Sequence, residues 1–184
     1  VAAFAREHRL ILHLDGARIF NAAVALGLPA SKLVAPADSI TFCLSKGLCA
    51  PVGSVLCGDA AFIKKARRLR KVLGGAMRQA GIIAAAGIVA LDDMVDRLAE
   101  DHRRAASLAE GLQNIDKVHL TKNAPQTNMV FFTLDESVRL SMAEFLTAMK
   151  QEGVLLMDSG PGEYRMVTHH DITDKAVGVA LDAF

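Results

Sequence analysis

The chain has 184 residues, of which 52% are hydrophobic and 22% are charged, and its formal net charge is +1. This composition predicts a globular protein of one domain or two small ones with a substantial core. The small net charge does not indicate a polyanionic partner. No apolar run reaches the roughly 18 residues of a membrane-spanning helix, so we expect no membrane partner.

The first part of the chain alternates helical and strand patterns, as α/β domains do. The predicted helices and strands are, in order, 1–9, 10–14, 21–26 and 39–44. The crossover between the two strands predicts that they run parallel. Asp15 and Lys46 would then leave the same edge of one sheet, where open α/β sheets bind ligands. Strand alternation places His13 on the same face as Asp15.

Lys46 is the most informative residue of this part. An apolar strand carries it into a turn bounded by glycine and proline. We expect a buried strand end, where an ammonium is costly to keep charged and the free amine can attack a carbonyl. Lys46 is therefore a candidate Schiff-base former. The alternative is a lysine that extends into solvent from an ordinary surface turn.

A third strand is predicted at 53–57, antiparallel to the second because the link between them is too short for a helical crossover. Asp59 can cap a helix from Phe62 to about Leu73. That helix carries a basic run of Lys64, Lys65, Arg67, Arg68, Arg70 and Lys71. Such a run can bind nucleic acid, but no aromatic residue interleaves the charges here, which favours a solvated helix face.

A glycine-rich loop at 74–81 precedes an alanine-rich helix. Backbone N–H groups of such a loop can hold a phosphate, and a packing turn between buried helices is the alternative. The spacing is not the dinucleotide fingerprint. From 92 to 112 an amphipathic pattern predicts one long connecting helix, and His102 in its apolar stripe is interpreted as structural.

The rest of the chain predicts a small α+β domain. Its expected strands and helices are 118–120, 128–134, 141–152, 154–157, 164–168 and 173–184. Ser141 and Glu144 form a capping-box pattern. Arg165 lies between apolar neighbours in the last strand, where it has either an anion to bind or an acidic partner within the fold. The predicted limits are 1–91 for a large domain, 92–115 for the connecting helix and 116–184 for the small domain.

Three cysteines in or beside apolar runs predict reduced thiols in an intracellular protein, in the cytoplasm or alternatively in the mitochondrion. They contain no CxxC pair, so we expect no metal site. The chain does not begin with methionine, and a helix is already in progress at its first residue. We therefore expect a carboxyl-terminal fragment whose targeting signals are not visible.

Four motifs together resemble the low-specificity L-threonine aldolase family, which are pyridoxal 5′-phosphate (PLP) enzymes of the aspartate-aminotransferase fold. The motifs are His13-Leu14-Asp15-Gly16-Ala17-Arg18, Ser45-Lys46-Gly47-Leu48-Cys49-Ala50-Pro51-Val52-Gly53-Ser54, Gly74-Gly75-Ala76-Met77-Arg78-Gln79-Ala80-Gly81 and Arg165-Met166-Val167-Thr168-His169. The resemblance covers nearly the whole chain. It implies part of a fold-type-I large domain followed by a small α+β domain.

The resemblance also implies roles. Lys46 would bind PLP covalently, and Asp15 would pair with the pyridinium nitrogen. Arg18 and Arg165 would hold the substrate carboxylate, one from each domain. Arg78 would lie near the cofactor phosphate of a neighbouring subunit in a homodimer or homotetramer. The implied reaction is cleavage of threonine or allo-threonine to glycine and acetaldehyde.

Several family parts have no match here: a phosphate loop, a histidine that stacks on PLP, a second histidine near the β-hydroxyl, and a serine at the carboxylate. Two alternatives therefore stay open. The same fold could carry another PLP reaction, such as β-elimination or transamination. A non-catalytic fragment could instead serve as an assembly module.

Overall fold

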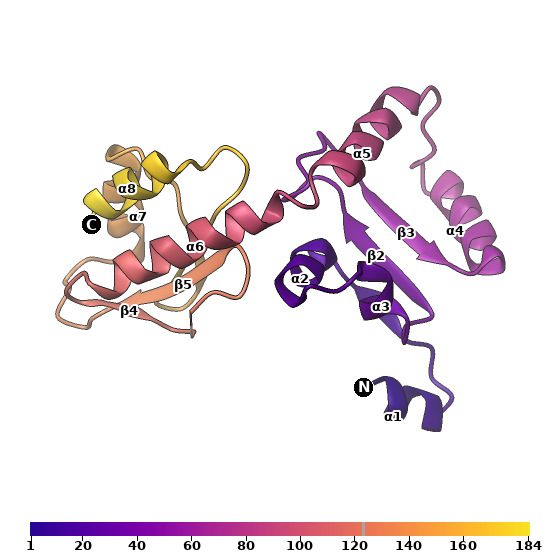
Figure 1. Ribbon diagram of the computed structural model, residues 1–184, viewed down its shortest axis with the longest axis horizontal. Coiled ribbons are helices and arrows are strands. Elements are labelled where there is room, and N and C mark those ends of the chain that lie inside the picture. The colour runs from indigo at the N-terminus through magenta and orange to yellow at the C-terminus, as the bar shows by residue number, and fades with distance from the viewer. Residues whose placement is uncertain (123) are drawn as a thin grey trace. The chain divides into compact units, whose positions relative to one another are not determined.

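The computed structural model describes residues 1–122 and 124–184, which form two compact units, 1–98 and 99–184 (Figure 1). Each unit has its own sheet, one of three strands and one of four. The division falls at the start of a long helix, α6. The domain limits expected from the sequence stay predictions. None of the described residues belongs to a helix long and apolar enough to cross a membrane.

The first unit is a three-stranded sheet with helices. Its elements are α1 (Ala2–Glu7), β1 (His13–Asp15), α2 (Ile19–Leu26), α3 (Ala30–Val34), β2 (Ser39–Cys43), β3 (Ser54–Gly58), α4 (Ala60–Val72) and α5 (Gly81–Asp93). The strand order is β1-β2-β3, with β1 and β2 parallel and β2 and β3 antiparallel. Both predicted strand directions are confirmed.

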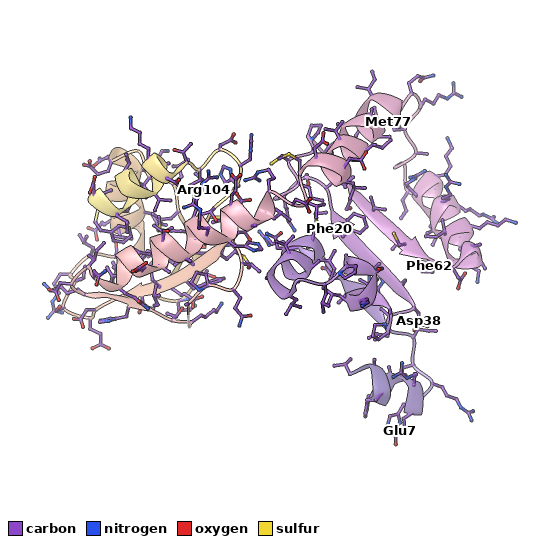
Figure 2. The ribbon with its side chains drawn as sticks, in the orientation of Figure 1. Glu7, Phe20, Asp38, Phe62, Met77 and Arg104 are labelled. Carbon is purple, nitrogen blue, oxygen red and sulfur yellow. The ribbon has the colours of Figure 1, made fainter. Side chains whose placement is uncertain are left out.

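The first strand is shorter than predicted, because its expected start at residues 10–12 is not paired as a strand. The Leu12 N–H donates to the Asp38 carboxylate at 2.8 Å, and the Asp38 N–H donates to the Leu12 carbonyl at 2.9 Å. Asp38, labelled in Figure 2, thus fixes the approach to β1 from the turn before β2.

The second unit is a four-stranded antiparallel sheet with three helices. Its elements are α6 (Leu98–Gln113, whose first residue belongs to the first unit), β4 (Val118–Leu120), β5 (Met129–Leu134), α7 (Met142–Gln151), β6 (Met157–Gly160), β7 (Glu163–Val167) and α8 (Asp174–Asp182). The strand order is β4-β5-β7-β6. Buried residues of α6, α7, α8 and three strands form one apolar cluster on one face of this sheet.

Two predictions for these elements are wrong. The helix expected over 92–112 is broken, because α5 ends at Asp93 and α6 begins at Leu98. Met94 and Val95, between them, pack against the small core of the first unit. The strand expected at 154–157 begins only at Met157, because the Val154 N–H closes the end of α7 by donating to the Met149 carbonyl at 2.8 Å.

Candidate functional site

The carboxyl edge of the three-stranded sheet brings Asp15 and Lys46 to one side of the first unit. Asp15 is the last residue of β1, and its register partner in β2 is Thr41. The Gly16 N–H donates to the Thr41 carbonyl at 2.8 Å, which extends the pairing past the strand end. Lys46 follows the end of β2 by three residues. Because the two strands are parallel, an acid and an amine leave the same sheet edge.

The turn after Asp15 packs closely around Gly16. A Cβ atom on Gly16 would lie 2.8 Å from the Ile40 Cδ1 atom, closer than two carbons can approach. The Ile19 N–H donates to the Gly16 carbonyl at 2.8 Å and starts α2, with Arg18 at its N-cap. Asp15 and Arg18 therefore belong to one closely packed turn, in which Asp15 is exposed and Arg18 is half-buried.

The turn that carries Lys46 is held by a backbone hydrogen bond and a buried side chain. The Cys49 N–H donates to the Lys46 carbonyl at 2.9 Å, and Leu48, which is buried, lies between them. Cys49 has a φ of 60°, in the left-handed region. A Cβ on Gly47 would lie 2.8 Å from the Leu98 Cδ2 atom. The backbone of this turn is therefore fixed on both sides of Lys46.

The Lys46 side chain is exposed, so the expectation that it lies buried at a strand end is wrong for this chain. The physical reason is the direction of the turn: Leu48 and Ala50 point into the core, and Lys46 projects outward.

A hydrogen-bonded histidine lies on the same face as Asp15. The His13 Nδ1 atom is 2.8 Å from the Ser39 hydroxyl, and its Nε2 atom is 3.3 Å from the Thr41 hydroxyl. The sequence placed His13 on this face but gave it no role. Its two hydroxyl partners are set by the register of β1 against β2, and the sequence does not indicate that register.

Arg78 lies in the loop between α4 and α5. The loop is confirmed, with Gly74 at a φ of 82° and Gln79 at 49°. Arg78 is exposed. Its role at a cofactor phosphate stays a prediction.

Arg165 belongs to the second unit, in β7, opposite Phe131 of β5 and Met157 of β6. Its Nη2 donates to the Met157 sulfur at 3.2 Å, a weak acceptor. Within the part of the chain that the structure describes, its Nε atom is buried without a hydrogen-bond partner. The guanidinium therefore keeps donor capacity for an anion.

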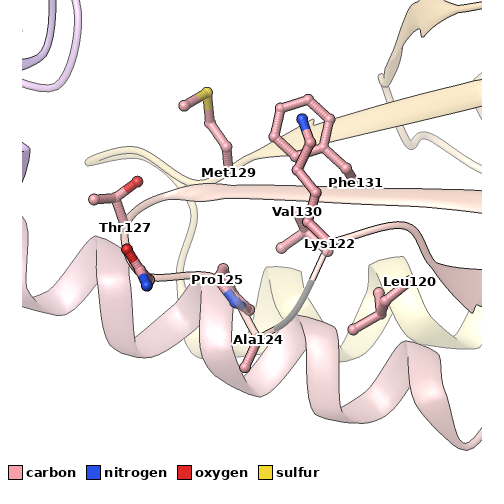
Figure 3. A pocket seen from close by; sticks show the side chains of 9 residues that line it. Leu120, Lys122, Ala124, Pro125, Thr127, Met129, Val130 and Phe131 are labelled. Carbon is pink, nitrogen blue, oxygen red and sulfur yellow. The ribbon is translucent and has the colours of Figure 1, made fainter.

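Phe131, the register partner of Arg165, has a second cation beside it, because the Lys122 ammonium lies 3.2 Å from the centroid of the Phe131 ring. Figure 3 shows these two side chains together. The residues around this pair line a cavity of about 250 Å³. Lys122 and Arg165 are thus two cations near one aromatic side chain on the face of the second sheet that points away from its core.

Known proteins are similar to the whole of this chain. It matches the beta-eliminating lyase family over residues 1–137. It is 44% identical over 184 residues to low-specificity L-threonine aldolase 1 of Arabidopsis thaliana, covering 100% of the chain and 51% of that protein. It is 45% identical over 170 residues to the low specificity L-threonine aldolase of Escherichia coli K12, covering 92% of the chain and 49% of that protein.

A solved structure described as Leishmania major threonine aldolase matches the fold with a TM-score of 0.76 at 21% identity, covering 98% of this chain and 53% of that one. This confirms the predicted fold class, a fold-type-I α/β domain with a small α+β domain. The chain spans about half the length of the curated relatives it matches. Its match over residues 1–137 shows that it belongs to the beta-eliminating lyase family.

Proposed function

We propose that this chain is part of a PLP-dependent aldehyde-lyase that cleaves L-threonine and L-allo-threonine to glycine and acetaldehyde. The observation that carries the proposal is the position of Asp15 and Lys46 at one edge of a pair of parallel strands. The similarity to two low-specificity L-threonine aldolases supports the choice of substrate.

The residues present have the chemistry that PLP needs. Lys46 offers an exposed primary amine on a fixed turn, which can attach to the cofactor aldehyde. Asp15 offers a carboxylate that keeps a ring nitrogen protonated by supplying the opposite charge. Arg78 offers a guanidinium for the phosphate. When bound, PLP supplies a ring that stabilises the negative charge left on Cα after the Cα–Cβ bond breaks.

The substrate is held by its carboxylate in this proposal. Arg18 and Arg165 would bind it through charge-assisted hydrogen bonds, and the spare donor capacity of Arg165 supports that role. A fixed carboxylate limits rotation about the bond from Cα, which orients the scissile bond. A homodimer or homotetramer is part of the same proposal, with Arg78 serving a neighbouring subunit.

The test uses the protein expressed from its complete gene. Borohydride reduction in the presence of PLP should leave a phosphopyridoxyl mass on the peptide that contains Lys46. The Lys46→Ala variant should lose this mass, the visible cofactor absorbance and acetaldehyde release from threonine. The Lys64→Ala variant, in the exposed basic run of α4, is the matched control and should keep all three. A modified peptide without Lys46 would contradict the proposal.

A second candidate function is β-elimination, which the family match favours. The two reactions release different products. Elimination yields ammonia and a keto acid, whereas aldol cleavage yields glycine and an aldehyde. Measuring both products from the same enzyme sample with threonine separates them, and a keto acid without acetaldehyde would replace the aldolase proposal.

A further inference from the structure

The face of the first sheet that carries Asp15 is polar over two strands. Side chains alternate along a strand, so His13 and Asp15 share a face of β1. The parallel register pairs His13 with Ser39 and Asp15 with Thr41. These four residues hold two neighbouring register positions on one face, with a histidine and an acid on one strand and two hydroxyl residues on the other.

Two hydrogen bonds hold the His13 ring at both nitrogens. The Nδ1 atom is 2.8 Å from the Ser39 Oγ atom, and Nε2 is 3.3 Å from the Thr41 Oγ1 atom. Ser39 is only 7% exposed, so one end of this arrangement is fixed in the sheet. The ring cannot rotate without breaking both contacts.

We propose that His13 is a positioning residue for Asp15, acting through the Thr41 hydroxyl. This inference rests on the proposed function, in which Asp15 pairs with the ring nitrogen of PLP. In this proposal His13 carries its proton on Nε2, so that the Ser39 hydroxyl donates to Nδ1 and the Nε2–H donates to the Thr41 hydroxyl. The Thr41 hydroxyl then has its proton left to donate to the Asp15 carboxylate across the strand pair.

The direction of this chain of hydrogen bonds has a chemical consequence. A hydroxyl that receives a hydrogen bond is a better donor, because hydrogen bonds in series polarise one another. A carboxylate that accepts a hydrogen bond stays ionised and keeps one orientation. The Asp15 carboxylate would therefore already be oriented when the ring nitrogen of PLP binds, and binding would not have to restrict its rotation.

This series of hydrogen bonds predicts one tautomer of His13, which can be observed without cofactor or substrate. Long-range proton–nitrogen NMR spectra of the apoprotein should show His13 protonated at Nε2 and bare at Nδ1. The Ser39→Ala variant should change the Nδ1 nitrogen shift of His13. An Nδ1-protonated His13 would reverse the direction of the hydrogen bonds and overturn the proposal.

Paired substitutions test the route to Asp15. The amide of Gln reaches the position of Nε2 and can still bond Thr41, whereas that of Asn reaches only the position of Nδ1. His13→Asn and Thr41→Val should weaken PLP binding about fivefold, the value of one net hydrogen bond of about 1 kcal/mol. His13→Gln and Thr41→Ser should stay within about twofold of the parent protein. His119→Gln, in β4 of the second unit, is the matched control.

The outcomes separate this inference from the proposed function. If the parent protein binds no PLP, both are overturned. If Asp15→Asn weakens PLP binding while Thr41→Val and His13→Asn leave it unchanged, only the positioning role is overturned. If His13→Gln weakens binding as much as His13→Asn, the ring acts by packing, and the hydrogen-bond route is again wrong. Circular dichroism of each variant confirms that it is folded.

Discussion

The two units differ in how they hold their elements together. In the second unit, buried residues of three helices and three strands meet around Phe132, whose ring lies 5.3 Å from Tyr164 and 5.4 Å from Phe184. The buried cluster of the first unit is formed by Leu48, Ala50, Ala90 and Leu98. No residue of α4 is buried, although all its residues are described.

This difference teaches how the candidate site is built. The residues that carry the proposed chemistry come mostly from the first unit, where close contacts at single positions hold two turns. Gly16 against Ile40 and Gly47 against Leu98 are such contacts. The positions of Asp15 and Lys46 are therefore set by two tight turns, while the second unit is held by one continuous buried cluster.

The largest expected effect compares the same substitution in the two units. Phe132→Ala removes a fully buried ring and should cost about 3–5 kcal/mol of unfolding free energy in the second unit. Phe62→Ala in α4, where the ring is 38% exposed, should cost less than about 2 kcal/mol. Native-state hydrogen exchange reads each unit separately. Equal losses at the two positions would contradict the difference in packing.

A second comparison uses glycines. A Cβ on Gly111 would overlap the Leu181 side chain in the second unit, so Gly111→Ala should destabilise that unit by about 1–3 kcal/mol. Gly81, at the start of α5, has open space around its Cβ position. Gly81→Ala should instead stabilise the first unit by about 0.4–1 kcal/mol through the unfolded chain. Chemical denaturation measures whether each substitution raises or lowers the unfolding free energy. A stabilising Gly111→Ala would show that the Leu181 side chain can move aside.

Local signals in the sequence predicted local structure well. Asp59 caps α4 by accepting from the Phe62 N–H at 2.8 Å, and Ser141 and Glu144 form the predicted capping box. A cap depends on residues three positions apart, which a sequence shows directly. The parallel pairing of β1 and β2 was also predictable, because a helical crossover fixes its direction.

Features that depend on distant packing were missed. The apolar spacing of 92–112 runs on without a break, yet Met94 and Val95 pack into the core of the first unit and interrupt the helix. The exposure of Lys46 depends on Leu48 turning inward. The hydroxyl partners of His13 depend on a register that no local pattern encodes.

Helix caps provide a third, smaller comparison. Ser141→Ala should cost about 1 kcal/mol, but α7 should stay helical because Phe145 and Met149 anchor it in the core. Asp59→Ala removes a similar hydrogen bond from α4, which has no buried anchor. Exchange of the α4 amides should therefore accelerate more than exchange of the α7 amides. Faster exchange in α7 than in α4 would mean that burial does not hold these helices.

The smallest effect is a pH dependence confined to the second unit. Burial lowers the pKa of His102 below its usual 6.5, and the charge of Asp101 opposes this only in part. As pH falls below about 6.5, the unfolded chain binds a proton at this position before the folded one does, so the second unit loses stability. The loss stops once pH passes below the folded pKa. Between about pH 7.5 and about pH 5.5, His102→Gln should flatten this slope in the second unit and leave the first unit unchanged. If the stability of the second unit still falls with pH in the His102→Gln protein, another group causes the dependence and the burial of His102 does not.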